Sequence, residues 1–292
     1  MKLYIPPSDK RIGSQSYIDA LTRVGISLTV DVHKADIVLP LTDRGAQEVQ
    51  NHPRFMPAAS LNIILDRLLL SETGMPTIPT TFIPTPDLAP EGSIVKLRNS
   101  ADPRSGYVYQ PHLGFPQTDL DISFAVNSAG EVFDFANLAL THLDAKMPGV
   151  NAMASQSDVD EVLPMIRSAC QRLGIRGGIH NVQFLKCEGG WCLIDWNPRP
   201  AFVHTEGLAA VHSYMEQPLA FMANKACEKQ SVFFLTKPYW ERPIPFYMEM
   251  PIRDLGLVPR RVKDVNGFPR ISGVGDTEAE VLAKFEQLES LL

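Results

Sequence analysis

Three oxygen-bearing side chains lie in two short apolar segments that a turn at 188–190 would join into a hairpin. Gln183 belongs to the first segment, and Asp195 and Asn197 belong to the second. Side chains alternate along a strand, so Asp195 and Asn197 share one face while Trp196 points to the other. Mg²⁺ prefers oxygen ligands and completes its shell with water and substrate phosphates. The pattern therefore predicts a divalent-cation site at this hairpin.

A cationic side chain follows the same segment. Arg199 comes two residues after Asn197. Its guanidinium is a rigid planar fork that suits a phosphate or the negative charge developing on an oxygen atom. The spacing equally allows a structural interpretation, in which Asp195 and Asn197 form a turn at the end of the strand and Gln183 is a surface residue.

The composition is that of an ordinary globular protein without an excess of positive charge. The 292 residues include 27 Lys and Arg against 33 Asp and Glu, a formal net charge of −6, and 45% are hydrophobic. Nucleic-acid binders that neutralise many phosphates carry a basic patch or stripe, so we do not expect a nucleic-acid partner. At roughly 150 residues per domain, the length predicts about two domains.

Membrane insertion and extracellular chemistry are also not expected. The apolar run 61–70 is interrupted by Asp66 and Arg67 and is shorter than the ~20 residues that a bilayer requires. The first residues lack the apolar stretch of a signal peptide, so a cytoplasmic protein without a membrane partner is expected. The 4 cysteines lack C-x-x-C spacing, which disfavours a zinc site. Cys187 and Cys192 could face each other across the hairpin, but a reducing compartment disfavours a disulfide.

Hydrophobic periodicity and turn residues predict the elements that position these groups. Strands at 2–5, 26–32 and 35–39 around a helix at 15–24 indicate an N-terminal α/β unit with a parallel sheet. Segment 6–13 contains no G-x-G-x-x-G, which disfavours dinucleotide binding there. The remaining elements are expected as helices at 60–74, 158–173 and 277–288, strands at 93–97, 107–110, 119–126, 131–135, 180–186, 191–196, 259–265 and 270–273, and a polar loop at 98–106.

The hairpin motifs resemble a known family. Asn181-Val182-Gln183-Phe184, followed by Ile194-Asp195-Trp196-Asn197-Pro198-Arg199, resembles the metal-binding hairpin of the ATP-grasp superfamily and is most similar in wording to the large subunit of carbamoyl phosphate synthetase. The resemblance implies that Gln183, Asp195 and Asn197 bind Mg²⁺ or Mn²⁺ on the phosphates of ATP, and that Arg199 contacts the transferring phosphoryl group. Asp195 stands where a glutamate is usual in the family. Its shorter side chain is less suited to bridging two metal ions.

Two upstream segments extend the resemblance. Asp66-Arg67 followed by Gly74-Met75-Pro76-Thr77-Ile78-Pro79 is similar to the helix and exit of the family, and implies that Arg67 contacts an ATP phosphate. Ser93-Ile94-Val95-Lys96 is similar to the strand whose basic residue grips the nucleotide phosphates, which implies that role for Lys96. Each residue also has an alternative interpretation. Arg67 could pair with Asp66 or Glu72 on a helix surface, and Lys96 could be a solvated lysine of an edge strand.

For the residues between these motifs, the resemblance implies which of them face the nucleoside. The glycine-rich lid of the family corresponds to 99–106, which has one glycine, so a shorter or differently closed lid is expected. The resemblance places Gln110 and His112 at the connection that binds adenine, with Gln110 where a glutamate often stands. It places Asp119 opposite the ribose hydroxyls.

The resemblance implies a fold and an activity. The expected class is α/β (α+β): an ATP-grasp fold with a short N-terminal α/β unit at 1–56, an ATP-grasp domain of two subdomains at 57–230, and a small C-terminal α+β cap at 231–292. The last segment, Pro269-Arg270-Ile271-Ser272-Gly273, also resembles biotin-carboxylase-type members. The expected activity is ATP- and Mg²⁺-dependent activation of a carboxylate as an acyl phosphate for attack by an amine.

Other functions are compatible with the same motifs. Within the superfamily, the alternatives are a carboxylase-like enzyme that phosphorylates bicarbonate and a small-molecule kinase. The alternative that is not an enzyme is a nucleotide-binding regulator. His204 and Glu206 follow the hairpin and could bind the acceptor or act as acid or base, although His204 could equally be a packed loop histidine. His142 is a lower-ranked substrate contact. Small-molecule carboxylate and amine substrates and a homodimer are expected.

Overall fold

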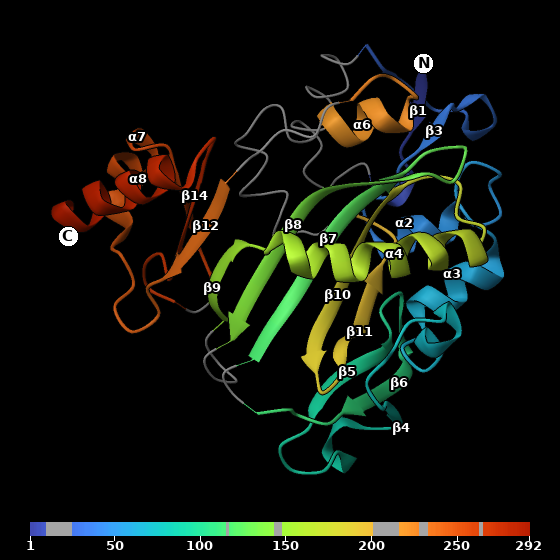
Figure 1. Ribbon diagram of the computed structural model, residues 1–292, viewed down its shortest axis with the longest axis horizontal. Coiled ribbons are helices and arrows are strands. Elements are labelled where there is room, and N and C mark those ends of the chain that lie inside the picture. Colours follow the sequence, from blue (N-terminus) through green and yellow to red (C-terminus); the bar gives the residue numbers. More distant parts are fainter. Residues whose placement is uncertain (10–24, 115–116, 143–147, 201–215, 228–232, 263–264) are drawn as a thin grey trace.

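The computed structural model describes residues 1–9, 25–114, 117–142, 148–200, 216–227, 233–262 and 265–292, without the side chains of 142–151. The described strands form three sheets (Figure 1). In the view of Figure 1 the N-terminal unit lies at the upper right, a three-stranded sheet at the lower right and the C-terminal segment at the left. The predicted mixed α/β class is confirmed.

An eight-stranded sheet is the centre of the molecule, in the order β11-β10-β7-β8-β9-β12-β14-β13. Its strands are β7 (Gln117–Val126), β8 (Val132–His142), β9 (Pro148–Met153), β10 (Ile179–Cys187), β11 (Gly190–Asn197), β12 (Phe233–Pro238), β13 (Leu257–Arg260) and β14 (Arg270–Gly275). One face packs against α4 (Gln156–Arg172) and α3 (Ala58–Leu65) through a core that includes Phe124, Phe184 and Trp196. Alternation along the strands leaves the opposite face available for other contacts.

The N-terminal unit packs on that opposite face. Its sheet, in the order β2-β1-β3, consists of β1 (Lys2–Tyr4), β2 (Ser27–Thr29) and β3 (Ile37–Val38), and both of its pairings are parallel, as predicted. Leu3 and Leu39 share a hydrophobic cluster with Ala125 of β7 and with Leu219 of α6 (Glu216–Met222). The predicted helix at 15–24 lies outside the described residues. Ala46 of α2 (Asp43–Glu48) belongs to the cluster that contains Phe124, Phe184 and Trp196, so the N-terminal unit also contributes to the core on the first face.

The three-stranded sheet, in the order β4-β6-β5, corrects one prediction. It contains β4 (Thr81–Ile83), β5 (Ile94–Asn99) and β6 (Asp102–Gln110), and β5 pairs with β6 as far as Asn99 opposite Asp102. The predicted polar loop at 98–106 is therefore wrong, because the chain turns at 100–101. The polar side chains close this turn: Asn99 Oδ1 accepts from Ala101 N at 2.9 Å, and Ser105 Oγ accepts from Asn99 N at 2.9 Å.

The predicted helix at 60–74 is also wrong as a single helix. Helix α3 ends at Leu65, and a separate 3₁₀ turn, η3 (Leu70–Thr73), ends at Gly74 in the left-handed conformation with φ 81°. Between them Asp66 is extended and forms a β-bridge with Asn99. The Asp66 carboxylate accepts from Arg98 Nη2 at 2.7 Å, and Arg67 N donates to Arg98 O at 3.0 Å. Pairing with β5 therefore overrides the helical periodicity of this segment.

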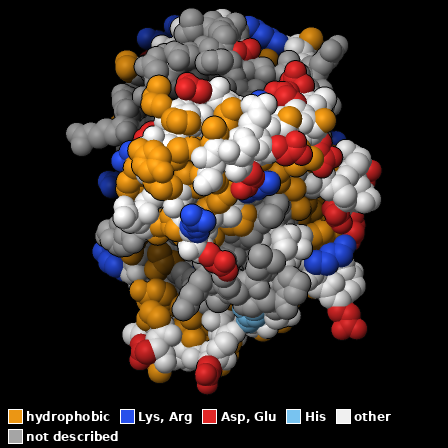
Figure 2. Space-filling view, turned by 90° about the vertical axis from the view of Figure 1, so that its left-hand side faces the viewer, with side chains coloured by type: hydrophobic (Ala, Val, Ile, Leu, Met, Phe, Trp, Pro, Cys, Tyr) orange, Lys and Arg blue, Asp and Glu red, His pale blue; other side chains and the backbone are white. Residues whose placement is uncertain are grey.

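The C-terminal segment completes the large sheet. Strand β12 pairs with β9 and β14, and α8 (Glu278–Leu291) begins after Thr277, whose side chain accepts from Glu280 N. The predicted boundaries at 56 and 230 remain a prediction, and this pairing joins the second and third predicted domains in one sheet. Figure 2 views this side of the molecule, where hydrophobic side chains lie among charged ones. Among the described helices, none has the length and hydrophobicity needed to cross a bilayer.

Candidate active site

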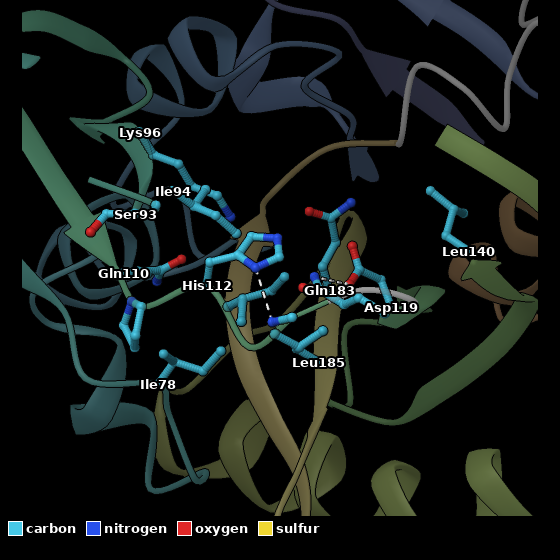
Figure 3. A pocket seen from close by; sticks show the side chains of 15 residues that line it. Ile78, Ser93, Ile94, Lys96, Gln110, His112, Asp119, Leu140, Gln183 and Leu185 are labelled. Carbon is cyan, nitrogen blue, oxygen red and sulfur yellow. Dashed lines mark hydrogen bonds between the residues drawn. The ribbon is translucent and has the colours of Figure 1, made fainter. Parts of the chain in front are cut away.

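A cavity of about 750 Å³ lies between the β4-β6-β5 sheet and the eight-stranded sheet. Figure 3 shows its two walls: Lys96 and Gln110 extend from the three-stranded sheet, and Asp119 and Gln183 extend from β7 and β10. The apolar part is formed by Ile78, Ile94, Leu140, Leu185 and Ile194. A cavity with one apolar region and a few converging polar groups is typical of a nucleotide or cofactor site.

Strand register places the three predicted metal ligands on one face of the hairpin. Gln183 pairs with Asp195, and Asn181 pairs with Asn197. The register shifts by one residue between Gln183 and Phe184, which makes a β-bulge next to Asp195. The hairpin therefore brings Gln183, Asp195 and Asn197 together, and Gln183 lies in the wall of the cavity.

Trp196 lies on the other face of the hairpin, as the alternation predicts. It is 1% exposed, and its indole Nε1 donates to His180 Nδ1 at 3.3 Å. His180 stacks on Phe124 with ring centroids 5.3 Å apart, and its Nε2 lies 3.0 Å from Gly177 O. Burial lowers the pKa of His180 from 6.5 to about 4, so the ring is neutral at pH 7 and can accept the Trp196 hydrogen bond.

Replacing His180 with phenylalanine is expected to change the acid sensitivity of the fold. The unfolded chain binds a proton at His180 near pH 6.5 and the folded protein only near pH 4, so this group lowers the free energy of unfolding as pH falls through that window. His180→Phe removes that term but leaves Trp196 Nε1 without an acceptor, at a cost of about 1–3 kcal/mol at neutral pH. Urea denaturation at several pH values measures both effects. His33→Phe, at an exposed histidine, is the control. If the free energy of unfolding of His180→Phe fell with pH as steeply as that of the parent, the prediction would be contradicted.

Arg67, in the segment between α3 and η3, pairs with the predicted metal ligand Asp195 of β11. Its Nη2 lies 2.9 and 3.0 Å from the two carboxylate oxygens of Asp195, and its Nη1 donates to Leu97 O at 2.6 Å. The alternative pairing with Asp66 or Glu72 is not what the structure contains, because Asp66 is bound to Arg98. Arg67 Nε is buried and has no hydrogen-bond partner among the described residues.

Lys96 shares the electrostatic environment of this pair. Desolvation lowers its pKa, the negative charges of Asp195 and Asp119 act to raise it, and the charge of Arg67 lowers it further. Lys96 lies on β5, an edge strand of its sheet, as the alternative interpretation has it, but its side chain is only partly exposed and lines the cavity. An ammonium that lines a cavity in this way is suited to binding phosphate.

The donor set fits a hard divalent cation. It offers one carboxylate from Asp195 and two amide side chains from Gln183 and Asn197, and a carboxylate that accepts from an arginine still has lone pairs for a metal. Gln183 Nε2 lies 3.5 Å from Asp121 Oδ2, which leaves the amide oxygen of Gln183 to bind a cation. Within the described part of the chain no three His, Cys, Asp or Glu residues form a metal-binding group. Such a site would rely on phosphate oxygens and water to complete the shell, as Mg²⁺ does.

The opposite end of the cavity is suited to a planar base and a sugar. Gln110 is buried and donates through Nε2 to Thr80 Oγ1 at 3.1 Å, while Pro111 and His112 line the cavity after β6 ends. His112 Nδ1 accepts from Gly114 N at 2.9 Å. Asp119 accepts from Gln117 Nε2 at 3.1 Å and also lines the cavity. The structure thus places Gln110, His112 and Asp119 in one cavity with Lys96 and Gln183.

The structure does not describe the side chains of three predicted residues. His204 and Glu206 are outside the described residues, and His142 is the last residue of β8, where its side chain is not described. Sequence reasoning assigned no role to Asp121, which is buried, accepts from Asn181 Nδ2 and neighbours Gln183. The Asp119-Leu120-Asp121 alternation on β7 was the available signal, since it places both carboxylates on the face of Gln183.

Arg199 lies beside the hairpin and contacts three partners. Its Nε donates to Asp43 Oδ1 at 3.0 Å, its Nη2 to Asn197 Oδ1 at 3.1 Å and its Nη1 to Pro200 O at 3.3 Å. The link to Asn197 places the guanidinium next to the predicted cation site. The partner Asp43 comes from the N-terminal unit, and no sequence motif pointed to it.

Comparisons with known proteins identify the fold. No protein-family model and no curated protein matches the chain. The N5-carboxyaminoimidazole ribonucleotide synthetase of Thermus thermophilus is 14% identical, with a TM-score of 0.66 over 100% of this chain and 98% of that one. The phosphoribosylaminoimidazole carboxylase ATPase subunit of Aquifex aeolicus is 14% identical, with a TM-score of 0.65 over 100% of both chains.

A third solved structure contains bound ligands. The N5-carboxyaminoimidazole synthase of Aspergillus clavatus, in complex with ADP and 5-aminoimidazole ribonucleotide, is 10% identical, with a TM-score of 0.66 over 99% of this chain and 97% of that one. At such identities the likeness is one of fold. The chain therefore has the ATP-grasp fold of these synthetases, as the resemblance of its hairpin motifs predicts.

Proposed function

We propose that the protein is an ATP- and Mg²⁺-dependent carboxylate-amine ligase. The observation that carries the proposal is the convergence of Lys96, Gln183 and Asp119 on one cavity, directly beside the Arg67–Asp195 pair. Lys96, the predicted metal hairpin and an apolar slot thereby border one cavity, where they would face the phosphates, the metal ion and the base of a nucleotide. The family motifs imply the same set of groups.

The chemistry requires positioning and charge neutralisation more than a reactive side chain. A carboxylate oxygen of the substrate attacks the γ-phosphorus of ATP, and ADP leaves with the electron pair of the broken P–O bond. An amine then attacks the acyl carbon of the acyl phosphate, inorganic phosphate leaves, and the amine nitrogen loses a proton. Lys96, Arg67 and Arg199 would bind the phosphate oxygens during the first step. Gln183, Asp195 and Asn197 would hold Mg²⁺, which neutralises phosphate charge when bound.

The similar solved structures support ATP and a small-molecule acceptor. One of them holds ADP together with 5-aminoimidazole ribonucleotide, and others in the same group hold ADP or ATP. The nucleotide site proposed for this chain lies in the cavity between the two sheets. A homodimer is a further proposal, which light scattering tests.

A carboxylase-like reaction is the second candidate. The similar Aquifex aeolicus protein is a carboxylase ATPase subunit, which favours bicarbonate as the group that is phosphorylated. The chemistry at the phosphates is the same, so the residues proposed here serve either reaction. The two candidates differ in the acceptor of the phosphoryl group.

The experiment that tests the proposal begins with a thermal-shift titration of ATP with and without Mg²⁺. A ligand that binds only the native state raises the melting temperature by mass action, so a Mg²⁺-dependent shift is expected. ADP release is then measured with carboxylates or bicarbonate, each with and without an amine. Release that requires both a carboxylate and an amine supports the ligase, and release with bicarbonate supports the carboxylase. A stable phosphorylated product indicates a kinase, and nucleotide binding without any ADP release indicates a regulator.

A further inference from the structure

The N-terminal unit supplies a carboxylate to Arg199, which lies beside the hairpin that carries the predicted cation ligands. Asp43 is the first residue of α2, and its Oδ1 accepts from Arg199 Nε at 3.0 Å. The two residues are 156 positions apart in the chain. The side chain of Asp43 is 10% exposed and that of Arg199 is 23% exposed. The contact therefore links two distant parts of the sequence in a partly buried place, where an ion pair is less screened by water and salt.

A network inside the N-terminal unit fixes the position of Asp43. The preceding residue, Thr42, accepts from Gly45 N at 2.9 Å, and its hydroxyl donates to the fully buried carboxylate of Asp9. Asp9 also accepts from Leu41 N at 2.7 Å. A Cβ at Gly45 would overlap the Asp9 carboxylate, so the close approach requires glycine. The backbone that carries Asp43 is thus held independently of Arg199.

The geometry at Arg199 shows what this fixed carboxylate can do. Because Asp43 accepts from Nε, it fixes the plane of the guanidinium and directs the Nη atoms toward Asn197 and Pro200. A planar guanidinium held in this way loses less conformational freedom when it binds a phosphoryl group. Another Asp–Arg pair of the N-terminal unit, Asp36 with Arg54 at 3.0 Å, joins exposed side chains within that unit.

We propose that Asp43 is a positioning residue that holds Arg199 for the transferring phosphoryl group. The proposal rests on the proposed function, because it assumes that Arg199 contacts that group. It adds that the N-terminal unit completes the phosphoryl-transfer site through one carboxylate. Asp43 acts through Arg199, and it is not assigned a contact with ATP.

The test compares binding of Mg²⁺–ADP with and without aluminium fluoride, which mimics the transferring phosphoryl group, by isothermal titration calorimetry. The parent is expected to bind ADP at least tenfold more tightly when aluminium fluoride is present. Asp43→Asn is expected to lose most of that enhancement and to bind Mg²⁺–ADP alone within about twofold of the parent. Asp36→Asn, the matched control in the same unit, is expected to keep the enhancement.

A double variant establishes that Asp43 acts through Arg199. If it does, adding Asp43→Asn to Arg199→Lys removes no more enhancement than Arg199→Lys alone, because coupled residues are not additive. If Asp43→Asn does not fold, Asp43→Glu displaces the charge by one methylene, and the same loss is expected. An unchanged enhancement in the Asp43 variants, or a fully additive double variant, overturns the inference. A parent that binds Mg²⁺–ADP without any enhancement overturns the proposed function as well.

Discussion

Replacing Asp195 with asparagine is expected to lower ATP turnover by about 10²–10³-fold, the effect of losing one group that stabilises charge in a transition state. Asp195 is the one carboxylate among the three proposed cation ligands, and it also pairs with Arg67 at 2.9 Å. Asparagine keeps the shape and one oxygen but removes the charge that would hold Mg²⁺. Mg²⁺-dependent stabilisation by ATP should therefore disappear in a thermal-shift titration.

A second aspartate provides a matched control for this substitution. Asp66 pairs with Arg98 at 2.7 Å, and both pairs link the 66–67 segment to its surroundings. Asp66 is not one of the three proposed cation ligands, and its carboxylate is bound to Arg98, so Asp66→Asn is expected to retain Mg²⁺-dependent ATP binding. Breaking a buried pair destabilises a protein, so both variants are assayed below their own melting temperatures. Asp195→Asn with the ATP and Mg²⁺ response of the parent would contradict the proposed metal site.

The hairpin that carries Asp195 could be predicted because residues close together in the sequence determine it. Two apolar segments separated by a Gly-Gly turn define a hairpin, and alternation then fixes which side chains share a face. The register of Gln183 with Asp195, and the buried position of Trp196, agree with that reasoning. The same local logic correctly places Thr277 at the start of α8, and Gly74 does act as a stop, although it ends η3 and not a single helix at 60–74.

The errors and omissions arise where distant segments decide the structure. Helix α3 ends at Leu65 because Asp66 pairs with β5, and nothing in the helical periodicity of that segment records a partner 32 residues away. The polar run after Lys96 predicts a loop, although its side chains close a tight turn. Asp43 could not be assigned to the site from the sequence, because its contact with Arg199 depends on how the N-terminal unit packs.

Lys96 is the second residue whose substitution should have a large effect. Lys96→Met is expected to weaken ATP binding about 10- to 100-fold, which corresponds to the loss of one charge-assisted hydrogen bond. Lys186→Met is the matched control, since Lys186 is on β10 but its ammonium is half-exposed and pairs with Glu161 at 3.4 Å. Calorimetric titration with ATP in the presence of Mg²⁺ measures both variants. Equal affinities for the two would contradict the assignment of Lys96 to the phosphates.

The pH dependence of ATP binding gives an independent test of Lys96. Desolvation lowers its pKa, so in the nucleotide-free protein Lys96 loses its proton at a lower pH than an ordinary lysine. Phosphates favour the ammonium form, so ATP binding must take up a proton once the pH exceeds that lowered pKa. The affinity for ATP is then constant at lower pH and falls as the pH rises toward about 10, the usual lysine range. Arginine keeps its charge throughout this range, so Lys96→Arg should flatten the alkaline fall. An equal fall in the parent and in Lys96→Arg would show that another group causes it.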